Sequence, residues 1–352
     1  MPVRRRSGRR RAGRVRRAAR NSRGLGGQPL RCGSLVHHHG PPTGPAARDA
    51  EHLQVQAPLV AFVLRLLAPA KVNLTFEVLG RRDDGYHEVR TILQALSLAD
   101  VLTFEASDDL TLTVEPEGAA PVEENLVLAA ARLLQREAGV LAGAAIHLAK
   151  RIPMAGGLGG GSSDAATALL GLRRLWGLDL DADALRELAA QLGSDVPFFV
   201  SGGTALGEGR GERLTSLPTP RGEAVVAVPD ASRPRDKTGQ MYGLLKPEHY
   251  TDGSATAEAE QRLRSGDPFG EGVVNAFDAV AVQAYPFYEA MREAFESVGL
   301  RPVLCGAGPS MFALADEGEG FALAGCLATQ AGCSALAVTF VGPWELEGVA
   351  GE

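Results

Sequence analysis

A run of glycines is the feature of this sequence that most clearly suggests chemistry. Five of the six positions from Gly156 to Gly161 are glycine, and the run continues through Ser162, Ser163 and Asp164 into residues with helical spacing. The first turn of a helix has unpaired N–H groups and a partial positive charge, and glycines let the backbone approach an anion closely. The pattern therefore predicts a loop that binds the phosphates of a nucleotide.

Neither of the two common nucleotide-binding fingerprints describes this run. The P-loop pattern GxxxxGK[ST] is absent because no lysine follows the glycines, and Ser162 stands where GxGxxG has its last glycine. A flexible glycine-rich linker is the alternative, but a linker would not lead directly into an amphipathic helix. We therefore favour the phosphate loop.

A lysine, an amide and an aspartate are further candidate groups. Lys71 and Asn73 lie two residues apart in a strand-like run, and strand alternation places both on the same face. Such a lysine could act beside an acid or a reacting hydroxyl, although an isolated lysine is more often a solvated surface residue. Asp195 follows a predicted helix and precedes Pro197 by two positions; taken alone, it is more often a turn or capping residue.

Two turns complete the set of candidate groups. In Asp84-Gly85-Tyr86-His87, the ring of Tyr86 and the two nitrogens of His87 could hold a flat heterocycle, or the segment is simply a hairpin turn with an exposed aromatic residue. The turn 304–310 contains two more glycines between strand-like runs, which by itself indicates little.

The elements that must position these groups mix strands and helices. Aliphatic runs predict strands at 63–67, 72–78, 101–105, 110–114, 145–149, 198–200, 303–305, 311–315 and 335–340. Helical spacing predicts helices from 126 with Asn125 as N-cap, over 165–176, over 183–192 with Gly193 as a left-handed C-cap, and over 284–298 and 318–329. Elements mixed without strict alternation indicate an α+β fold.

Charge divides the chain unevenly. The 352 residues carry a formal net charge of −6, yet residues 1–48 contain thirteen arginines and no acid, which leaves 23 basic against 42 acidic residues afterwards. We expect a disordered basic leader at 1–62, an N-terminal domain at 63–215 and a C-terminal domain at 216–345, with the Pro, Gly and charge-rich stretch 210–272 as the boundary zone. A nucleic-acid-binding arm or an organellar targeting segment is the less favoured interpretation of the leader.

The apolar runs and the cysteines indicate the compartment. The longest apolar run, 57–70, is too short and too broken for a membrane span, which needs about 20 residues. Four cysteines without CxxC spacing favour a reducing compartment, so we expect a cytoplasmic protein without bound membrane or nucleic acid.

Taken together and in this order, the motifs resemble the GHMP kinase superfamily, named for galactokinase, homoserine kinase, mevalonate kinase and phosphomevalonate kinase. The resemblance extends from about residue 64 to 342, and DGYH after PAKVN points to the family that acts on 4-diphosphocytidyl-2-C-methyl-D-erythritol. One departure is Pro309, which follows the Gly-Ala-Gly turn that the family usually has without a proline.

The resemblance implies a two-domain fold, with an N-terminal domain like domain 2 of ribosomal protein S5 and a ferredoxin-like C-terminal domain. It implies ATP and Mg²⁺ as cofactors, the cytidyl diphosphate as small-molecule substrate, and a monomer or weak homodimer. Phosphoryl transfer to the 2-hydroxyl would need a base, and the family gives this role to Asp195, with Lys71 keeping the carboxylate ionised. Another GHMP small-molecule kinase, and a catalytically inactive regulator, are the alternatives.

The resemblance also implies two sets of binding residues and leaves the metal ligands unknown. The nucleotide set is Pro153, Gly156, Gly157, Leu158, Gly159, Gly160, Gly161, Ser162, Ser163 and Asn125. The substrate set is Asn73, Tyr86, His87, Tyr242, Gly306 and Gly308.

Overall fold

The computed structural model describes residues 63–117, 122–230, 237–267, 269 and 272–344. The expected leader at 1–62 lies outside these residues, as does Cys32. The described cysteines, Cys305, Cys326 and Cys333, are free. None of the helices within the described ranges has both the length and the apolar character needed to cross a bilayer.

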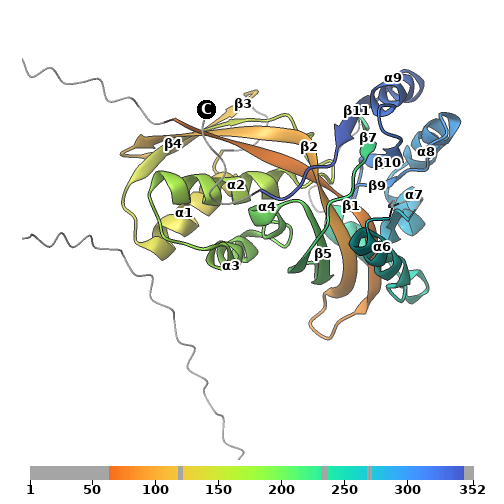
Figure 1. The fold of residues 1–352 in the computed structure, drawn as a ribbon, viewed down its shortest axis with the longest axis horizontal. Coiled ribbons are helices and arrows are strands. Elements are labelled where there is room, and N and C mark those ends of the chain that lie inside the picture. Colours follow the sequence, from red (N-terminus) through yellow and green to blue (C-terminus); the bar gives the residue numbers. More distant parts are fainter. Residues whose placement is uncertain (1–62, 118–121, 231–236, 268, 270–271, 345–352) are drawn as a thin grey trace, which may run out of the picture. The chain divides into compact units, whose positions relative to one another are not determined.

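A seven-stranded sheet forms one half of the described body (Figure 1). Two long antiparallel strands, β1 and β2, lie at its centre, and β2 pairs with β5 through its first half and with β4 through its second half. The seven strands are β1 (Leu64–Arg81), β2 (His87–Ser107), β3 (Leu110–Glu115), β4 (Gly143–Ala149), β5 (Thr204–Gly209), β6 (Arg213–Leu217) and β8 (Val274–Asn275).

Four helices follow one another along this sheet: α1 (Leu126–Ala138), α2 (Gly160–Leu175), α3 (Ala182–Leu192) and α4 (Phe198–Ser201). The apolar face of α2 packs on β1 and β2, so the residues just before α2 lie close to Lys71 of β1. The Asn125 side chain accepts a hydrogen bond from the Val127 N–H, which confirms the predicted N-cap of α1.

A second, four-stranded sheet has the order β11-β7-β10-β9 and is antiparallel throughout. Its strands are β7 (Glu223–Val228), β9 (Val303–Leu304), β10 (Met311–Ala315) and β11 (Ser334–Thr339), and its helices include α8 (Tyr288–Ser297) and α9 (Gly320–Ala331). The remaining elements are α5 (Lys237–Leu244), α6 (Ser254–Ser265), α7 (Ala281–Ala284), and the short 3₁₀ helices at Pro247–His249 and Ala276–Val280.

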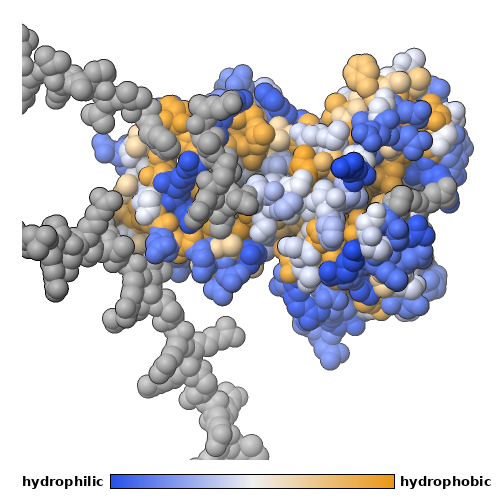
Figure 2. Space-filling view, viewed as in Figure 1, coloured by the Kyte–Doolittle hydropathy of each residue, from blue (hydrophilic) through white to orange (hydrophobic). Residues whose placement is uncertain are grey.

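One core cluster joins the two sheets, because apolar residues of β1 and β2 pack with those of β7 and β10. The hairpin between β1 and β2 projects beyond this core, and Figure 2 shows its tip as a hydrophilic surface. The mixture of strands and helices confirms the α+β prediction, whereas the domain bounds at 63–215 and 216–345 stay a prediction.

Three local predictions were wrong or incomplete. Residues 198–200 begin helix α4 rather than a strand, because a short buried apolar run fits either element and Pro197 has a helical φ of −58°. Gly193 has a φ of 165°, so it ends α3 in an extended rather than a left-handed conformation. The stretch 210–272 contains β6, β7, α5 and α6 rather than only a boundary.

Candidate active site

The glycine run forms a tight loop that ends in helix α2. Three of its residues have positive φ, namely Ala155 at 52°, Gly157 at 87° and Gly159 at 73°. Gly159 is the N-cap and α2 begins at Gly160, so the last two glycines already form the first turn, five residues before the apolar face at 165–176 from which the helix was predicted. The unpaired N–H groups of this turn therefore point into the loop, as an anion site requires.

This phosphate loop, residues 153–161, is packed against the turn at 305–310. A Cβ atom on Gly157 would lie 1.8 Å from the Cys305 carbonyl oxygen, so only glycine fits at this position. The Ser310 N–H donates to the Gly156 carbonyl at 3.2 Å. The second glycine turn, which indicated little in the sequence, thus supports the back of the phosphate loop.

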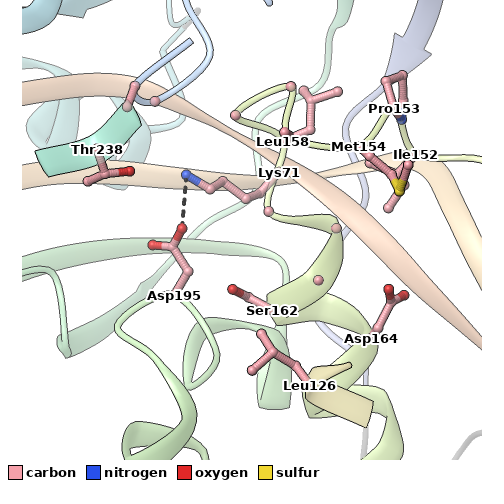
Figure 3. A pocket seen from close by; sticks show the side chains of 18 of the residues that line it. Lys71, Leu126, Ile152, Pro153, Met154, Leu158, Ser162, Asp164, Asp195 and Thr238 are labelled. Carbon is pink, nitrogen blue, oxygen red and sulfur yellow. Dashed lines mark ion pairs between the residues drawn. The ribbon is translucent and has the colours of Figure 1, made fainter. Parts of the chain in front are cut away.

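Lys71 connects strand β1 to the same loop. Its N–H donates to the Leu158 carbonyl at 2.9 Å, and its Nζ lies 3.4 Å from Asp195 Oδ2 (Figure 3). The side chain of Lys71 is 5% exposed, whereas that of Asp195 is 44% exposed. The structure therefore brings together the two residues predicted to be catalytic, with the carboxylate facing open space.

Asn73 holds the ammonium group of Lys71 in place. Lys71 Nζ donates to Asn73 Oδ1 at 2.7 Å, and Asn73 Nδ2 donates to the Thr91 hydroxyl at 2.8 Å. The shared face predicted for Lys71 and Asn73 is confirmed. Because both polar atoms of the Asn73 amide have partners within the protein, its position supports Lys71, and its contact with a substrate stays a prediction.

A first pocket of about 410 Å³ lies over the phosphate loop. Nine of the ten residues predicted to bind the nucleotide line it: Asn125, Pro153, Gly156, Gly157, Leu158, Gly159, Gly160, Gly161 and Ser162. Ser163 does not, because its side chain is fully buried, and its hydroxyl makes no hydrogen bond within the described part of the chain. In Figure 3 the Ser162 hydroxyl points toward the side of the pocket on which Asp195 lies.

A second pocket of about 750 Å³ adjoins the first and contains the aromatic residues. His87 stacks on Tyr242 with ring centroids 4.7 Å apart, and the Arg210 guanidinium lies 4.7 Å from the Tyr86 ring centroid. Burial lowers the pKa of His87, and the charge of Arg81 lowers it further, so the ring is held neutral as a hydrogen-bonding group.

Tyr242 is the more enclosed ring of this group, and burial raises the pKa of its hydroxyl. Asn73 and Gly306 also line the second pocket, whereas Gly308 lines neither pocket. Six residues line both pockets: Lys71, Ser162, Asp195, Thr238, Gly306 and Ala307.

Sequence reasoning missed a buried ionic cluster at the base of the first pocket. Lys150 Nζ lies 2.5 Å from Asp100 Oδ2 and 2.7 Å from Asp164 Oδ2, and all three side chains are nearly inaccessible. Asp100 also accepts hydrogen bonds from the N–H groups of Arg151 and Ile152. Because Lys150 precedes the phosphate loop and Asp164 follows it, the cluster joins the two ends of the loop.

Burial raises the pKa of Asp164 to about 7; the ammonium of Lys150 opposes this rise and the carboxylate of Asp100 adds to it. The sequence carried a partial signal, a lysine three positions before Pro153 and an aspartate in the first turns of α2. Asp100 had none, because only strand pairing brings it there.

No group of three or more His, Cys, Asp or Glu side chains is placed to hold a metal ion in the described ranges. Mg²⁺ usually keeps several waters and binds through substrate phosphates and one or two protein oxygens. The oxygens of Ser162 and Asp195 are available for that limited role at the junction of the two pockets.

Comparison with known proteins gives consistent matches. Residues 125–203 match the family model described as GHMP kinases N terminal domain. A 4-diphosphocytidyl-2-C-methyl-D-erythritol kinase of Dehalococcoides mccartyi is 43% identical over 254 residues, which cover 72% of this chain and 89% of the relative. One from Pelotomaculum thermopropionicum is 43% identical over 264 residues, 73% of this chain and 91% of the relative.

Solved structures agree with these matches. A crystal structure of 4-(cytidine 5'-diphospho)-2C-methyl-D-erythritol kinase aligns with a TM-score of 0.68 and 36% identity, over 79% of this chain and all of the other. A homoserine kinase from Cytophaga hutchinsonii, 18% identical with a TM-score of 0.62 over 80% of this chain and 95% of the other, shares the fold. The expected two-domain architecture is thereby confirmed.

Proposed function

Since this chain belongs to the 4-diphosphocytidyl-2-C-methyl-D-erythritol kinase family of the GHMP kinases, we propose that it phosphorylates that alcohol with ATP, at the 2-hydroxyl. The reaction is a step of the non-mevalonate isoprenoid pathway. The expected cytoplasmic location and the expected monomeric or weakly dimeric state stay predictions.

One observation carries the proposal: the ion pair of Lys71 and Asp195 lies in the wall shared by the two pockets. A kinase must hold the terminal phosphoryl group of the donor next to the hydroxyl of the acceptor, with a base at the point of contact. A nucleotide in the first pocket and an alcohol in the second would meet at this ion pair.

The residues at this junction divide the chemistry among them. Asp195 accepts the proton of the acceptor hydroxyl, a role for which its exposed carboxylate is suited. Lys71 remains positively charged beside it and stabilises the negative charge that develops on the attacking oxygen. The first-turn N–H groups of α2 donate hydrogen bonds to the phosphate oxygens. They stabilise the negative charge on these oxygens as the bond to the leaving group breaks.

Mg²⁺ supplies charge neutralisation and orientation of the phosphates when it is bound. Ser162, whose side chain lies at the junction of the two pockets, would be the protein oxygen that holds it. Lys71 and the helix terminus act on the same phosphates from the protein side.

The second pocket accounts for the choice of acceptor. A cytosine ring is flat and carries hydrogen-bonding edges, and Tyr86, His87 and Tyr242 provide aromatic faces together with a neutral imidazole. We propose that the cytosine ring stacks among these aromatic side chains while the methylerythritol end of the substrate reaches Asp195.

The test measures ADP release with a panel of alcohols: the cytidyl diphosphate of methylerythritol, mevalonate, homoserine and galactose. We expect turnover with the cytidyl compound and a kcat/KM at least about 100-fold lower with the others, because they lack the cytosine ring that the second pocket would bind. Turnover with mevalonate or homoserine but not with the cytidyl compound would instead show another GHMP activity.

A further inference from the structure

Asn275 is a buried amide that holds the turn between the two pockets. It is the last residue of β8, it pairs in parallel with Phe76 of β1, and it is 6% exposed. Its Nδ2 donates to the Leu304 carbonyl at 2.9 Å and to the Gly306 carbonyl at 2.8 Å. Its Oδ1 accepts from the Phe277 N–H at 2.9 Å, which fixes the amide with its nitrogen toward the turn.

The next two carbonyls of this turn are also bound by side chains. The Tyr285 hydroxyl donates to the Ala307 carbonyl at 2.5 Å. Lys237, the first residue of α5, donates to the Gly308 carbonyl at 2.5 Å and to the Ala155 carbonyl of the phosphate loop at 2.7 Å. Three successive carbonyl oxygens, those of residues 306–308, therefore face side-chain donors.

The backbone of the turn does not by itself select this orientation. Gly306 has a φ of 56°, and a glycine adopts positive and negative φ at similar cost, so the peptide that follows it is free to rotate. A Cβ atom on Gly306 would lie 3.5 Å from Lys71 Nζ, so the turn touches the ion pair of Lys71 and Asp195. A carbonyl turned toward this junction would place a partial negative charge where the phosphoryl group is transferred. The hydrogen bond from Asn275 favours the opposite orientation.

The orientation of this peptide also determines where the Ala307 N–H points. The peptide between Gly306 and Ala307 is trans, so its C=O and its N–H point in opposite directions. The carbonyl faces Asn275, which lines neither pocket, whereas Gly306 and Ala307 line both. The Ala307 N–H has no acceptor within the described part of the chain, whereas the Gly308 N–H donates to the Cys305 carbonyl at 2.9 Å. The turn therefore offers one N–H donor on the side away from Asn275.

We propose that Asn275 is a positioning residue for phosphoryl transfer: by holding the Gly306 carbonyl, it directs the Ala307 N–H at an oxygen of the phosphoryl group in transit. The inference rests on the proposed kinase function and adds to it a residue outside every motif. A fixed N–H donor at this place stabilises the charge of the transition state more than it stabilises either bound substrate. Loss of the Asn275 amide should therefore lower kcat and leave both KM values almost unchanged.

The experiment measures kcat, KM for ATP, KM for the cytidyl substrate and urea unfolding for the full-length protein. The variants are Asn275→Ser and Asn275→Thr, whose hydroxyls can still accept from the Phe277 N–H but are too short to reach the two carbonyls. Two replacements are used so that either one decides if the other folds poorly. Tyr285→Phe is the matched control, because it also removes a buried hydrogen bond to a carbonyl of the turn, but the N–H of that peptide, on Gly308, already donates to Cys305.

We expect kcat of both Asn275 variants to fall by roughly 10- to 100-fold, somewhat less than the loss of a whole transition-state donor, because the rotating peptide still visits the productive orientation. Both KM values should stay within about threefold of the wild type. Tyr285→Phe should lose a similar amount of stability and keep kcat within about twofold. An unchanged kcat in the Asn275 variants, or a fall in kcat that Tyr285→Phe shares, would overturn the inference and leave the proposed function standing. A wild type that phosphorylates no alcohol of the panel would overturn both.

Discussion

The carboxylate of Asp195 lies 3.4 Å from the ammonium of Lys71, yet its side chain is 44% exposed whereas that of Lys71 is 5% exposed. Because water screens the exposed carboxylate of Asp195, the ion pair contributes little to the stability of the fold. The arrangement favours reactivity instead. The lysine is fixed by Asn73 and Leu158, and the acid remains accessible to an incoming hydroxyl.

Replacing the carboxylate of Asp195 by an amide tests its role as a base. Asp195→Asn should lower kcat by roughly 10²- to 10⁴-fold, the usual contribution of general base catalysis, and leave ATP affinity within a few-fold of the wild type. Steady-state ADP release and nucleotide titration measure the two quantities. Asp183→Asn is the control, since Asp183 is an exposed aspartate of α3. Near-normal turnover of Asp195→Asn would remove this residue from the mechanism.

The aromatic ring of Tyr242 should affect one substrate only. Tyr242→Ala removes the ring that stacks on His87, so KM for the cytidyl substrate should rise about 3- to 10-fold, as expected for the loss of one stacking contact, while KM for ATP stays unchanged. Tyr242→Phe keeps the ring and should behave as the wild type. A parallel rise in both KM values would show a general disturbance of the site instead.

Two glycines of the phosphate loop should respond differently to alanine. At Gly157 the φ is 87° and a Cβ would lie 1.8 Å from the Cys305 carbonyl, so Gly157→Ala should reduce the free energy of unfolding by about 2–4 kcal/mol. At Gly161 a Cβ meets only the Leu126 side chain, at 3.8 Å, so Gly161→Ala should fold as stably as the wild type. Urea unfolding compares them, and equal losses would contradict the packing described for residue 157.

The buried cluster around Lys150 predicts a pH dependence of stability. Two carboxylates share one ammonium, and the folded protein raises the pKa of Asp164 from 3.8 to about 7. The folded state then binds more protons than the unfolded state between about pH 4 and pH 7, so the contribution of Asp164 to stability falls as the pH rises through this range.

Asp164→Asn removes this titration and keeps an acceptor for Lys150. Relative to the wild type, the variant should be nearly neutral at pH 5 and more stable by roughly 1–3 kcal/mol at pH 8. Urea unfolding at both pH values measures the difference, with Asp183→Asn as the control. A loss of stability that is the same at pH 5 and pH 8 would show that the ionised carboxylate is needed at both.

The parts of the site that the sequence predicted are those with local signals. The glycines from Gly156 to Gly161, the cap at Asn125 and the shared face of Lys71 and Asn73 follow from conformational freedom, side-chain capping and strand alternation. Asp100 could not be predicted, since its contact with Lys150 requires the pairing of β2 with β4. Lys237 lay in a stretch without a motif, and only the packing of α5 places it beside Ala155.

The hydrogen bond from the Lys71 N–H to the Leu158 carbonyl joins strand β1 to the phosphate loop. The same lysine packs its Cγ against Gly159, where a Cβ would lie only 2.9 Å away. The loop conformation that the glycines allow therefore also sets where the Lys71 ammonium lies beside Asp195. The loop that would hold the donor and the lysine that pairs with the proposed base form one packed unit, so a side chain forced in at Gly159 would disturb both.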